Sequence, residues 1–197
     1  MRVQTILAHP LPDSFAAAVH RTAADTLRDA GHEVAETDLY AQGFEPALTA
    51  AERAAYHRPD YDTTAVAPLV ERLRWADALV LVYPHWWFDM PAIMKGYFDR
   101  VWAPGVAFRH DPAGGTIRPL LTNLRHVAVL TSFGSPWWIN ALGLRHPSRR
   151  ILRVGVVGAC APKARFHWRA LYDMDRSTPD TRARFLAAAA ADMRRLG

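Results

Sequence analysis

Three short segments of this 197-residue chain carry side chains that could hold a flat ligand with an anionic end. Residues 8–15 (AHPLPDSF) place His9 and Ser14 just before an expected helix, where free backbone N–H groups suit a phosphate. Residues 83–91 (YPHWWFDMP) gather four aromatic side chains, a histidine and two prolines. Residues 131–138 (TSFGSPWW) offer hydroxyls and a glycine that could bond the polar edge of a ring. Together the segments predict a site for a planar ligand.

Each segment also has a simpler interpretation. Ser14 is a common type of helix N-cap, Trp87 and Phe88 could pack a helix onto a sheet, and residues 131–138 could form an ordinary turn. For the first and third segments taken singly, the simpler interpretation is favoured. Two tryptophans directly after an apolar run are hard to place in solvent. Three such segments at corresponding strand ends therefore favour a joint site.

The elements that must position these segments can be located from hydrophobic periodicity. Five segments are typical of strands: residues 3–7, 32–39, 78–83, 126–131 and 154–158. The run at 78–83 is apolar on both faces, as in the centre of a parallel sheet. Helices are expected after the N-cap Ser14, after Thr49, whose spacing to Glu52 matches a capping box, from about 65 to 75, from Pro91 to about 102, and from Pro179 onward.

Strands that alternate with helices predict an α/β fold with a parallel sheet, and five strands suggest the order 2-1-3-4-5. In such sheets, ligands bind outside the carboxyl ends of the strands, where the strand order reverses. The three segments follow the first, third and fourth expected strands. Residues 1–197 show no linker and predict a single domain, and residues 103–121 are expected to form a long irregular loop with a function.

Composition and charge exclude several classes of protein. The chain is 50% hydrophobic and 22% charged, with a net charge of +5 that is concentrated in its second half. No nucleic-acid-binding motif accompanies this charge, so no nucleic-acid partner is expected. The single Cys160 cannot form an internal disulfide, and no apolar run is long enough to span a membrane, so a cytoplasmic protein is expected. The nine histidines lack metal-binding spacings such as HExxH, so no metal site is expected.

At the three segments the sequence resembles the NAD(P)H:quinone oxidoreductase family, which has the flavodoxin-like fold. AHPLPDSF resembles the opening AHP…SF motif of that family, and the aromatic loop with PAIMKG at 91–96 resembles its most specific stretch. TSFG at 131–134 resembles its TTGG turn. The resemblance covers nearly the whole chain. It implies a three-layer sandwich, with a five-stranded parallel sheet of order 2-1-3-4-5 between helices.

The resemblance also implies roles for individual residues. Those expected to bind a flavin are His9, Ser14, Phe15, Ala16, Pro84, His85, Trp86, Trp87, Phe88, Thr131, Ser132, Phe133 and Gly134. Phe108, His110, Trp137 and Trp138 are expected on the substrate side. Because histidine titrates near neutral pH, His110 is expected to be the catalytic proton donor. Phe133 stands where the family has glycine, which adds bulk over the flavin ring.

The expected function is that of a flavin-dependent enzyme in which NAD(P)H and then a quinone react in one pocket by a ping-pong mechanism. FAD is the expected cofactor, with FMN as the alternative. Because seven tryptophans are many for this length, and Trp86, Trp102, Trp137 and Trp138 lie in or beside loops, a homodimer that completes the site is also expected. The alternative is a non-enzymatic flavin-binding electron carrier or a regulatory subunit of a membrane transporter.

Overall fold

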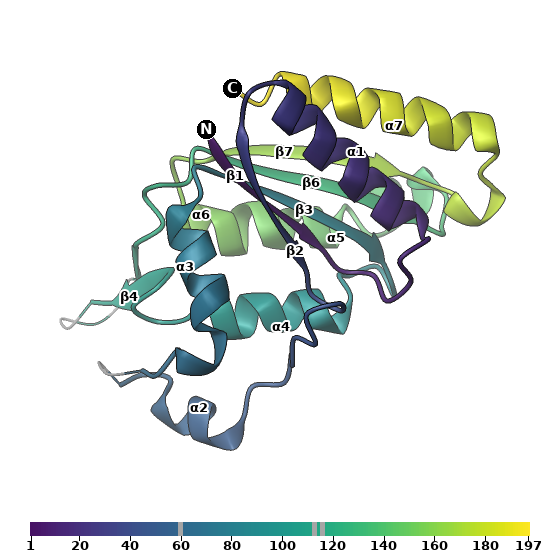
Figure 1. The fold of residues 1–197 in the computed structure, drawn as a ribbon. Helices are drawn as coiled ribbons and strands as arrows, with labels where there is room; N and C mark the ends of the chain where they lie inside the picture. The colour runs from purple at the N-terminus through teal and green to yellow at the C-terminus, as the bar shows by residue number, and fades with distance from the viewer. Residues whose placement is uncertain (59–60, 112–113, 115–116) are drawn as a thin grey trace.

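A five-stranded parallel sheet forms the centre of the molecule in the computed structural model, which describes residues 1–58, 61–111, 114 and 117–197 (Figure 1). The strands lie in the order β2-β1-β3-β6-β7, which is the predicted order 2-1-3-4-5 once the strands of a small separate hairpin are left out. All neighbouring pairs are parallel. The strands are β1 (Arg2–Leu7), β2 (Glu33–Asp38), β3 (Ala78–His85), β6 (His126–Phe133) and β7 (Arg165–Leu171).

Helices cover both faces of the sheet and give three layers, as predicted (Figure 1). Helices α1 (Phe15–Asp29) and α7 (Pro179–Arg194) pack on one face. The other face is covered by α3 (Ala67–Trp75), α4 (Ala92–Val101) and a helical stretch made of α5 (Pro147–Arg150), η3 (Ile151–Val157) and α6 (Gly158–Cys160). The short elements α2 (Ala50–Ala55), η1 (Thr64–Val66), η2 (Ile139–Gly143) and η4 (Met174–Arg176) lie in connections.

The central strand β3 is buried on both faces because its side chains alternate between two apolar clusters. Leu79, Leu81 and Tyr83 join the cluster under α3 and α4, whereas Val80 and Val82 join the one under α1 and α7. All five are almost fully buried, and burial of each aliphatic side chain stabilises the fold by roughly 1.5–3 kcal/mol. This explains why residues 78–83 gave the strongest strand signal in the sequence.

Local signals in the sequence correctly located several helix ends. The Ser14 side chain caps α1 by accepting a hydrogen bond from the Ala17 N–H, and Gly31, just beyond that helix, has the left-handed φ of +81°. Thr49 and Glu52 form the predicted capping box of α2. The terminal helix α7 begins at Pro179, as predicted, with Thr178 as its N-cap.

The predicted fifth strand at residues 154–158 is wrong. These residues are helical, and the fifth strand is β7, at residues 165–171. The error has a physical cause. Leu152, Val157 and Cys160 are buried on one side of the helical stretch, while Val154 is exposed, so the apolar residues do not form a strand core. As an edge strand, β7 (RFHWRAL) is mostly half-buried and lacks a continuous apolar run.

The connection at residues 103–121 is not entirely irregular, because it contains a small antiparallel hairpin. Its strands are β4 (Phe108–His110) and β5 (Ile117–Pro119). Residues 112, 113, 115 and 116 of this predicted loop lie outside the described residues. In the part of the chain that is described, no helix is long and apolar enough to cross a membrane.

Candidate functional site

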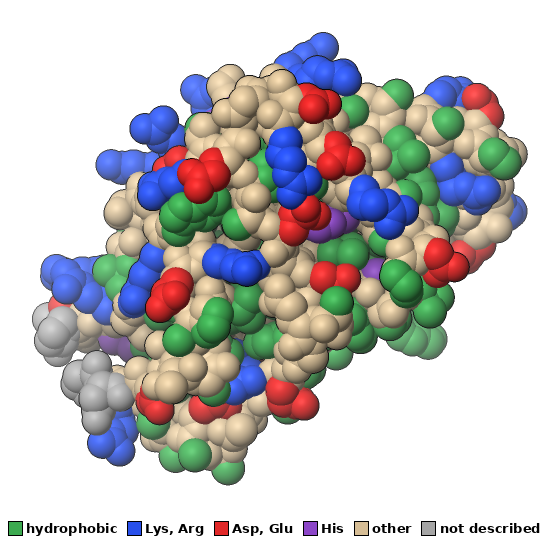
Figure 2. All heavy atoms as spheres, viewed as in Figure 1, with side chains coloured by type: hydrophobic (Ala, Val, Ile, Leu, Met, Phe, Trp, Pro, Cys, Tyr) green, Lys and Arg blue, Asp and Glu red, His purple; other side chains and the backbone are tan. Residues whose placement is uncertain are grey.

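A cavity of about 480 Å³ opens at the carboxyl edge of the sheet, where the predicted segments meet. Hydrophobic side chains gather over the loops at this edge (Figure 2). Leu11, Trp86 and Trp87, in the first two of these segments, are exposed. Four chain segments contribute to the wall, which brings together residues that are distant in sequence. The lining residues are His9, Phe15, Ala16, Pro84, His85, Trp86, Trp87, Ser132, Gly134, Met174 and Asp175.

The start of α1 supplies backbone donors to this cavity. The N–H groups of a first helical turn have no acceptor within the helix. The Ala17 N–H is bonded by the Ser14 hydroxyl, whereas Phe15 and Ala16, one and two residues into the helix, line the cavity. His9 lies beside them, and its Nδ1 accepts a hydrogen bond from the Leu11 N–H. In the neutral ring the proton is therefore on Nε2, so this end of the cavity suits an anionic group.

The aromatic segment after β3 forms a tight turn with an unusual backbone. Trp86 and Asp89 exchange two backbone hydrogen bonds of 3.0 and 3.2 Å across it. The two central residues, Trp87 and Phe88, have φ values of +53° and +64°, which is the pattern of a type I′ turn. Asn-Gly normally occupies such turns, and a residue with a Cβ in this region is strained by roughly 1–2 kcal/mol. The turn leaves the Trp87 side chain 97% exposed at the mouth of the cavity.

Two of the predicted flavin-contacting residues, His85 and Phe133, are almost fully buried. His85 is only 7% exposed, and burial lowers the pKa of its imidazole to about 3. The ring of Phe133 stacks on it with centroids 3.8 Å apart, so Phe133 points into the core and does not add bulk inside the cavity. Thr131 is buried next to them and hydrogen-bonds His85.

The carboxyl end of β6 and the residue after it offer small groups to the cavity. Ser132 and Gly134 line it on either side of the inward-pointing Phe133. The hydroxyl of the next residue, Ser135, is buried without a hydrogen-bond partner. A Cβ at Gly134 would lie 2.7 Å from Oδ2 of Asp175, so the glycine leaves room for that carboxylate. A planar polar ligand fits this wall because small residues let it approach the backbone closely.

Sequence reasoning missed two residues of this wall, Met174 and Asp175. Both lie in η4, directly after β7, at the same edge of the sheet as the other segments. They were overlooked because the fifth strand was placed too early in the chain, at 154–158. A strand at 165–171 would have marked the segment after it as a fourth part of the site.

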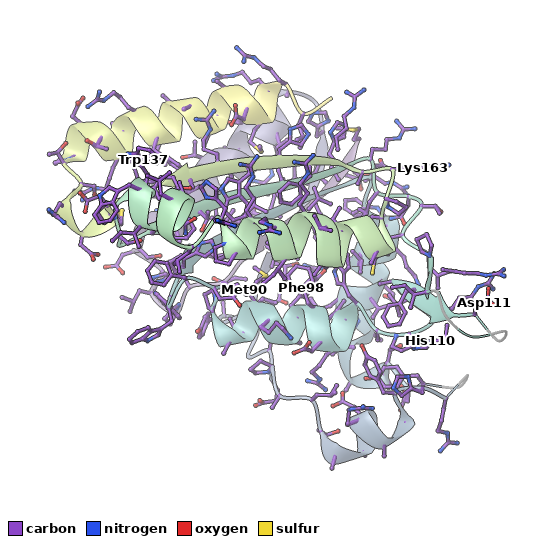
Figure 3. All side chains as sticks on the ribbon, turned by 180° about the vertical axis from the view of Figure 1, so that it is seen from behind. Met90, Phe98, His110, Asp111, Trp137 and Lys163 are labelled. Atoms are coloured by element: carbon purple, nitrogen blue, oxygen red, sulfur yellow. The ribbon has the colours of Figure 1, made fainter. Side chains whose placement is uncertain are left out.

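The predicted substrate-side residues do not join this cavity within one chain. Figure 3 shows Trp137 near the start of α7 and His110 at the opposite end of the molecule, on the small hairpin. There, His110 Nε2 lies 3.2 Å from His57 Nδ1. Phe108 lines a second cavity of about 240 Å³ together with Phe98 of α4. Trp137 and Trp138 are about half exposed and do not line the first cavity.

Exposed apolar side chains are concentrated around the helical stretch at 139–157. Leu142 and Val154 are 71% and 70% exposed, and Leu144 and Ile151 are also exposed. The sequence suggested that Trp102 lies in or beside a loop and is partly exposed to solvent, but it is buried in the cluster that α4 covers. The surface that a partner could cover therefore consists of this helical stretch together with Trp137 and Trp138. Trp102 is not part of it.

Comparison with protein families matches residues 1–195 to the family described as a flavodoxin-like fold. The chain belongs to this family. The match agrees with the sheet order and with the cavity at the carboxyl edge. Together with relatives named NAD(P)H dehydrogenase [quinone] 1 and NAD(P)H:quinone oxidoreductase, this match confirms the resemblance to NAD(P)H:quinone oxidoreductases noted in the sequence.

Individual relatives of this flavodoxin-like chain carry informative names. It is 35% identical over 120 residues to a ribosyldihydronicotinamide dehydrogenase-like protein of Penicillium crustosum, covering 53% of this chain and 45% of that protein. It is 27% identical to NAD(P)H dehydrogenase [quinone] 1 of Cavia porcellus, covering 94% of this chain and 74% of that protein. Several other curated relatives are matched over about half of their length.

A solved structure extends the similarity to nearly complete chains. The NAD(P)H:quinone oxidoreductase from Methanothermobacter marburgensis superposes with a TM-score of 0.84 at 27% sequence identity. The superposition covers 100% of this chain and 99% of that one. The whole three-layer architecture, and with it the edge that holds the cavity, is therefore shared with that protein.

Proposed function

We propose that this protein is a flavin-dependent NAD(P)H oxidoreductase that reduces quinones or similar two-electron acceptors. The observation that carries the proposal is one cavity lined by the carboxyl ends of β3 and β6 and by the segments that follow β1, β3, β6 and β7. Relatives named NAD(P)H dehydrogenase [quinone] and NAD(P)H:quinone oxidoreductase support it.

The residues that line the cavity fit a flavin. The Phe15 and Ala16 N–H groups and His9 would hold the phosphate region, with Ser14 fixing the helix end. Pro84 and the turn at 86–88 would lie along the isoalloxazine, and Ser132 to Gly134 would bond its polar edge. Trp86, which packs against His9 with ring centroids 6.0 Å apart, would close one side. We propose FAD as the cofactor, with FMN as the alternative.

A bound flavin would supply the chemistry, by taking a hydride from NAD(P)H and passing it to the acceptor. The chain itself would position the reactants and stabilise developing charge. Backbone N–H groups at 132–134 would face the negative charge that builds up during reduction. Trp87 would offer a broad apolar surface to the ring or to the nicotinamide. Because the two substrates would use one opening in turn, ping-pong kinetics are proposed.

The acceptor side of the site requires a second copy of the chain under this proposal. His110 and Phe108 do not line the cavity of their own chain, and Phe108 lines the second cavity. The exposed apolar side chains around 139–157 are typical of a surface that a partner covers. A two-fold dimer would bury this surface and could bring the hairpin of one copy to the cavity of the other. His110 would then donate a proton to the acceptor, with Trp137 and Trp138 at the interface. A reducing, cytoplasmic location is also proposed.

The test begins with the purified protein, after FAD or FMN has been offered during purification. Denaturation should release a flavin that its absorption bands identify, and the native protein should oxidise NAD(P)H when a quinone is supplied. A colourless protein with no affinity for either flavin would overturn the proposal. A flavin-bound protein that does not pass electrons to quinones would favour the electron carrier or the regulatory subunit.

A further inference from the structure

His85 is a buried polar side chain for which the proposed reaction has no use. It forms part of the cavity wall, yet the residue is only 7% exposed. Both of its ring nitrogens have partners inside the protein: Nδ1 lies 2.8 Å from Thr131 Oγ1, and Nε2 lies 2.8 Å from Ser148 Oγ. Neither nitrogen is left free to bond a ligand.

The direction of these hydrogen bonds is fixed by their neighbours. The Thr131 hydroxyl donates to the backbone carbonyl of Tyr83, at 2.6 Å. Its oxygen can therefore only accept from His85, which places the ring proton on Nδ1. Nε2 is then an acceptor, and the Ser148 hydroxyl must donate to it. The result is one continuous series of hydrogen bonds, from Ser148 through His85 and Thr131 to the Tyr83 carbonyl.

These hydrogen bonds join the ends of two paired strands to a helix that packs on the sheet. Tyr83 and His85 belong to β3, Thr131 to β6, and Ser148 to α5. His85 and Phe133 form the last pair in the β3–β6 register, and their rings stack at an interplanar angle of 14°. Phe133 in turn stacks on Tyr172, just after β7, with centroids 5.0 Å apart. The imidazole thus links three strand ends and one helix.

The charge state of the ring suits a structural link. Burial lowers the pKa of His85 to about 3, so the imidazole is neutral at physiological pH. A neutral ring with both nitrogens bonded needs no counter-ion and contributes no titrating charge to the cavity wall.

We propose that His85 is a positioning residue for the flavin site, an inference that rests on the proposed function. Its imidazole helps to fix the position of the turn at 86–89 relative to the segment at 132–134, and both segments contribute lining residues to the cavity. It acts through the backbone of these two segments and does not contact the reacting atoms. Its loss should therefore change how the flavin is held, beyond any effect on the stability of the fold.

Three variants separate this role from a general effect on folding. His85→Phe keeps an aromatic ring for stacking but removes both hydrogen bonds. Ser148→Ala removes only the bond to Nε2 and cannot overfill the core. Met193→Ala is the matched control, because Met193 is equally buried but lies in the last turns of α7, away from the cavity.

The measurements are the Kd of the apoprotein for FAD and FMN, the visible circular dichroism of the bound flavin, and the melting temperature. Ser148→Ala should raise the Kd roughly 3- to 10-fold and His85→Phe at least roughly 10-fold, since each leaves buried groups unpaired. The double variant should match His85→Phe, because the bond of Ser148 is already gone. Met193→Ala should lower the melting temperature and leave the Kd and the dichroism unchanged.

The outcomes are distinguishable. If the wild type binds flavin and both variants bind it with unchanged Kd and dichroism, the positioning role is wrong while the proposed function stands. If Met193→Ala raises the Kd as much as Ser148→Ala at equal loss of stability, the effect is general destabilisation and the inference is also overturned. A wild type that binds neither flavin contradicts the proposed function itself.

Discussion

The carboxylate of Asp175 occupies the space that a side chain on Gly134 would need. Oδ2 lies 2.7 Å from the position of a Cβ at residue 134, closer than real Cβ contacts allow. The two residues come from different connections, one after β6 and the other after β7, and both line the cavity. Their proximity fixes how near a ligand can come to the backbone at this point.

Gly134→Ala should therefore displace the Asp175 side chain into the cavity. We expect the affinity for flavin to fall roughly tenfold, equivalent to about 1.4 kcal/mol, with little change in melting temperature because a flexible side chain can move at small cost. The measurement is flavin titration of the apoprotein. In an Asp175→Ala background the same glycine substitution should cost much less. An equal loss in both backgrounds would show that Asp175 is not the obstacle.

The strained turn at Trp87 and Phe88 predicts that substitutions which stabilise the fold will weaken flavin binding. Replacing these residues with Asn and Gly, the residues that favour a type I′ turn, should relieve strain and stabilise the fold by about 1–2 kcal/mol. That corresponds to a rise in melting temperature of about 2–8 °C for a chain of this size. The flavin occupancy should fall at the same time because the aromatic surface is lost.

The control for this prediction is Trp137→Asn, which removes a half-exposed tryptophan that lacks a positive φ. It should give no comparable gain in melting temperature. Trp87→Ala alone should also lower flavin occupancy. A destabilised Asn-Gly variant would mean that the turn is not strained.

His85 predicts a specific dependence of stability on pH. Its pKa is about 3 in the folded protein, against 6.5 for an unperturbed histidine. The unfolded chain therefore binds the extra proton first, and the contribution of His85, complete above pH 6.5, is lost as the pH falls towards 3. The free energy of unfolding should decrease by about 1.4 kcal/mol per pH unit in this window on account of His85.

Denaturant unfolding of the wild type and of His85→Phe between pH 8 and pH 4 would check this slope. The variant lacks the titrating ring, so the difference between the two proteins should shrink as the pH falls. The buried His20 also has a lowered pKa and is present in both proteins, so its effect cancels. A difference that is independent of pH would contradict the neutral, buried state of His85.

His110→Ala should lower quinone turnover by roughly 10- to 100-fold and leave the flavin content unchanged, because a general acid makes only a partial contribution. The measurement is steady-state NAD(P)H oxidation together with released flavin. His167→Ala, in the amino-terminal half of β7 and outside the cavity, is the control and should change neither. Loss of flavin in His110→Ala would place His110 in the cofactor site and contradict the proposed division of the pocket.

The exposed apolar surface predicts how the dimer can be dissociated. Val154→Glu would place a charge in the proposed interface and should give a monomeric mass by light scattering, with loss of quinone turnover. Ala187→Glu, on the exposed side of α7, should leave the mass of the wild type unchanged. A wild type that is monomeric and fully active at nanomolar concentration would contradict the dimer.

Sequence reasoning succeeded where a signal is local. Ser14 and the Thr49–Glu52 box cap their helices through contacts within four residues, and residues 78–83 are apolar because both faces of their strand are buried. It failed at β7 because an edge strand is only half-buried, and polar residues such as Arg169 are tolerated there. Because the strand was not predicted, Asp175, which follows it and lines the cavity, was not predicted as a site residue either.

Other features of the site depend on contacts that no local pattern reveals. His85 looked like a ligand-facing residue because it follows a strand among aromatics, but its direction depends on partners 46 and 63 residues away in the chain. Likewise, the distance between His110 and the cavity depends on how the hairpin folds away from the sheet. Only the assembled chain determines these relationships.

The register of β3 and β6 makes the site intolerant of small length changes. Pro84 and Ser132 pair in the ladder and both line the cavity, while the rings of the next pair, His85 and Phe133, stack on each other and are almost fully buried. Because successive side chains of a strand point to opposite faces, deleting or inserting one residue in either strand would exchange the two sets. Natural variation in the length of this region should therefore be found after the paired strands, in the loops beyond residues 85 and 133.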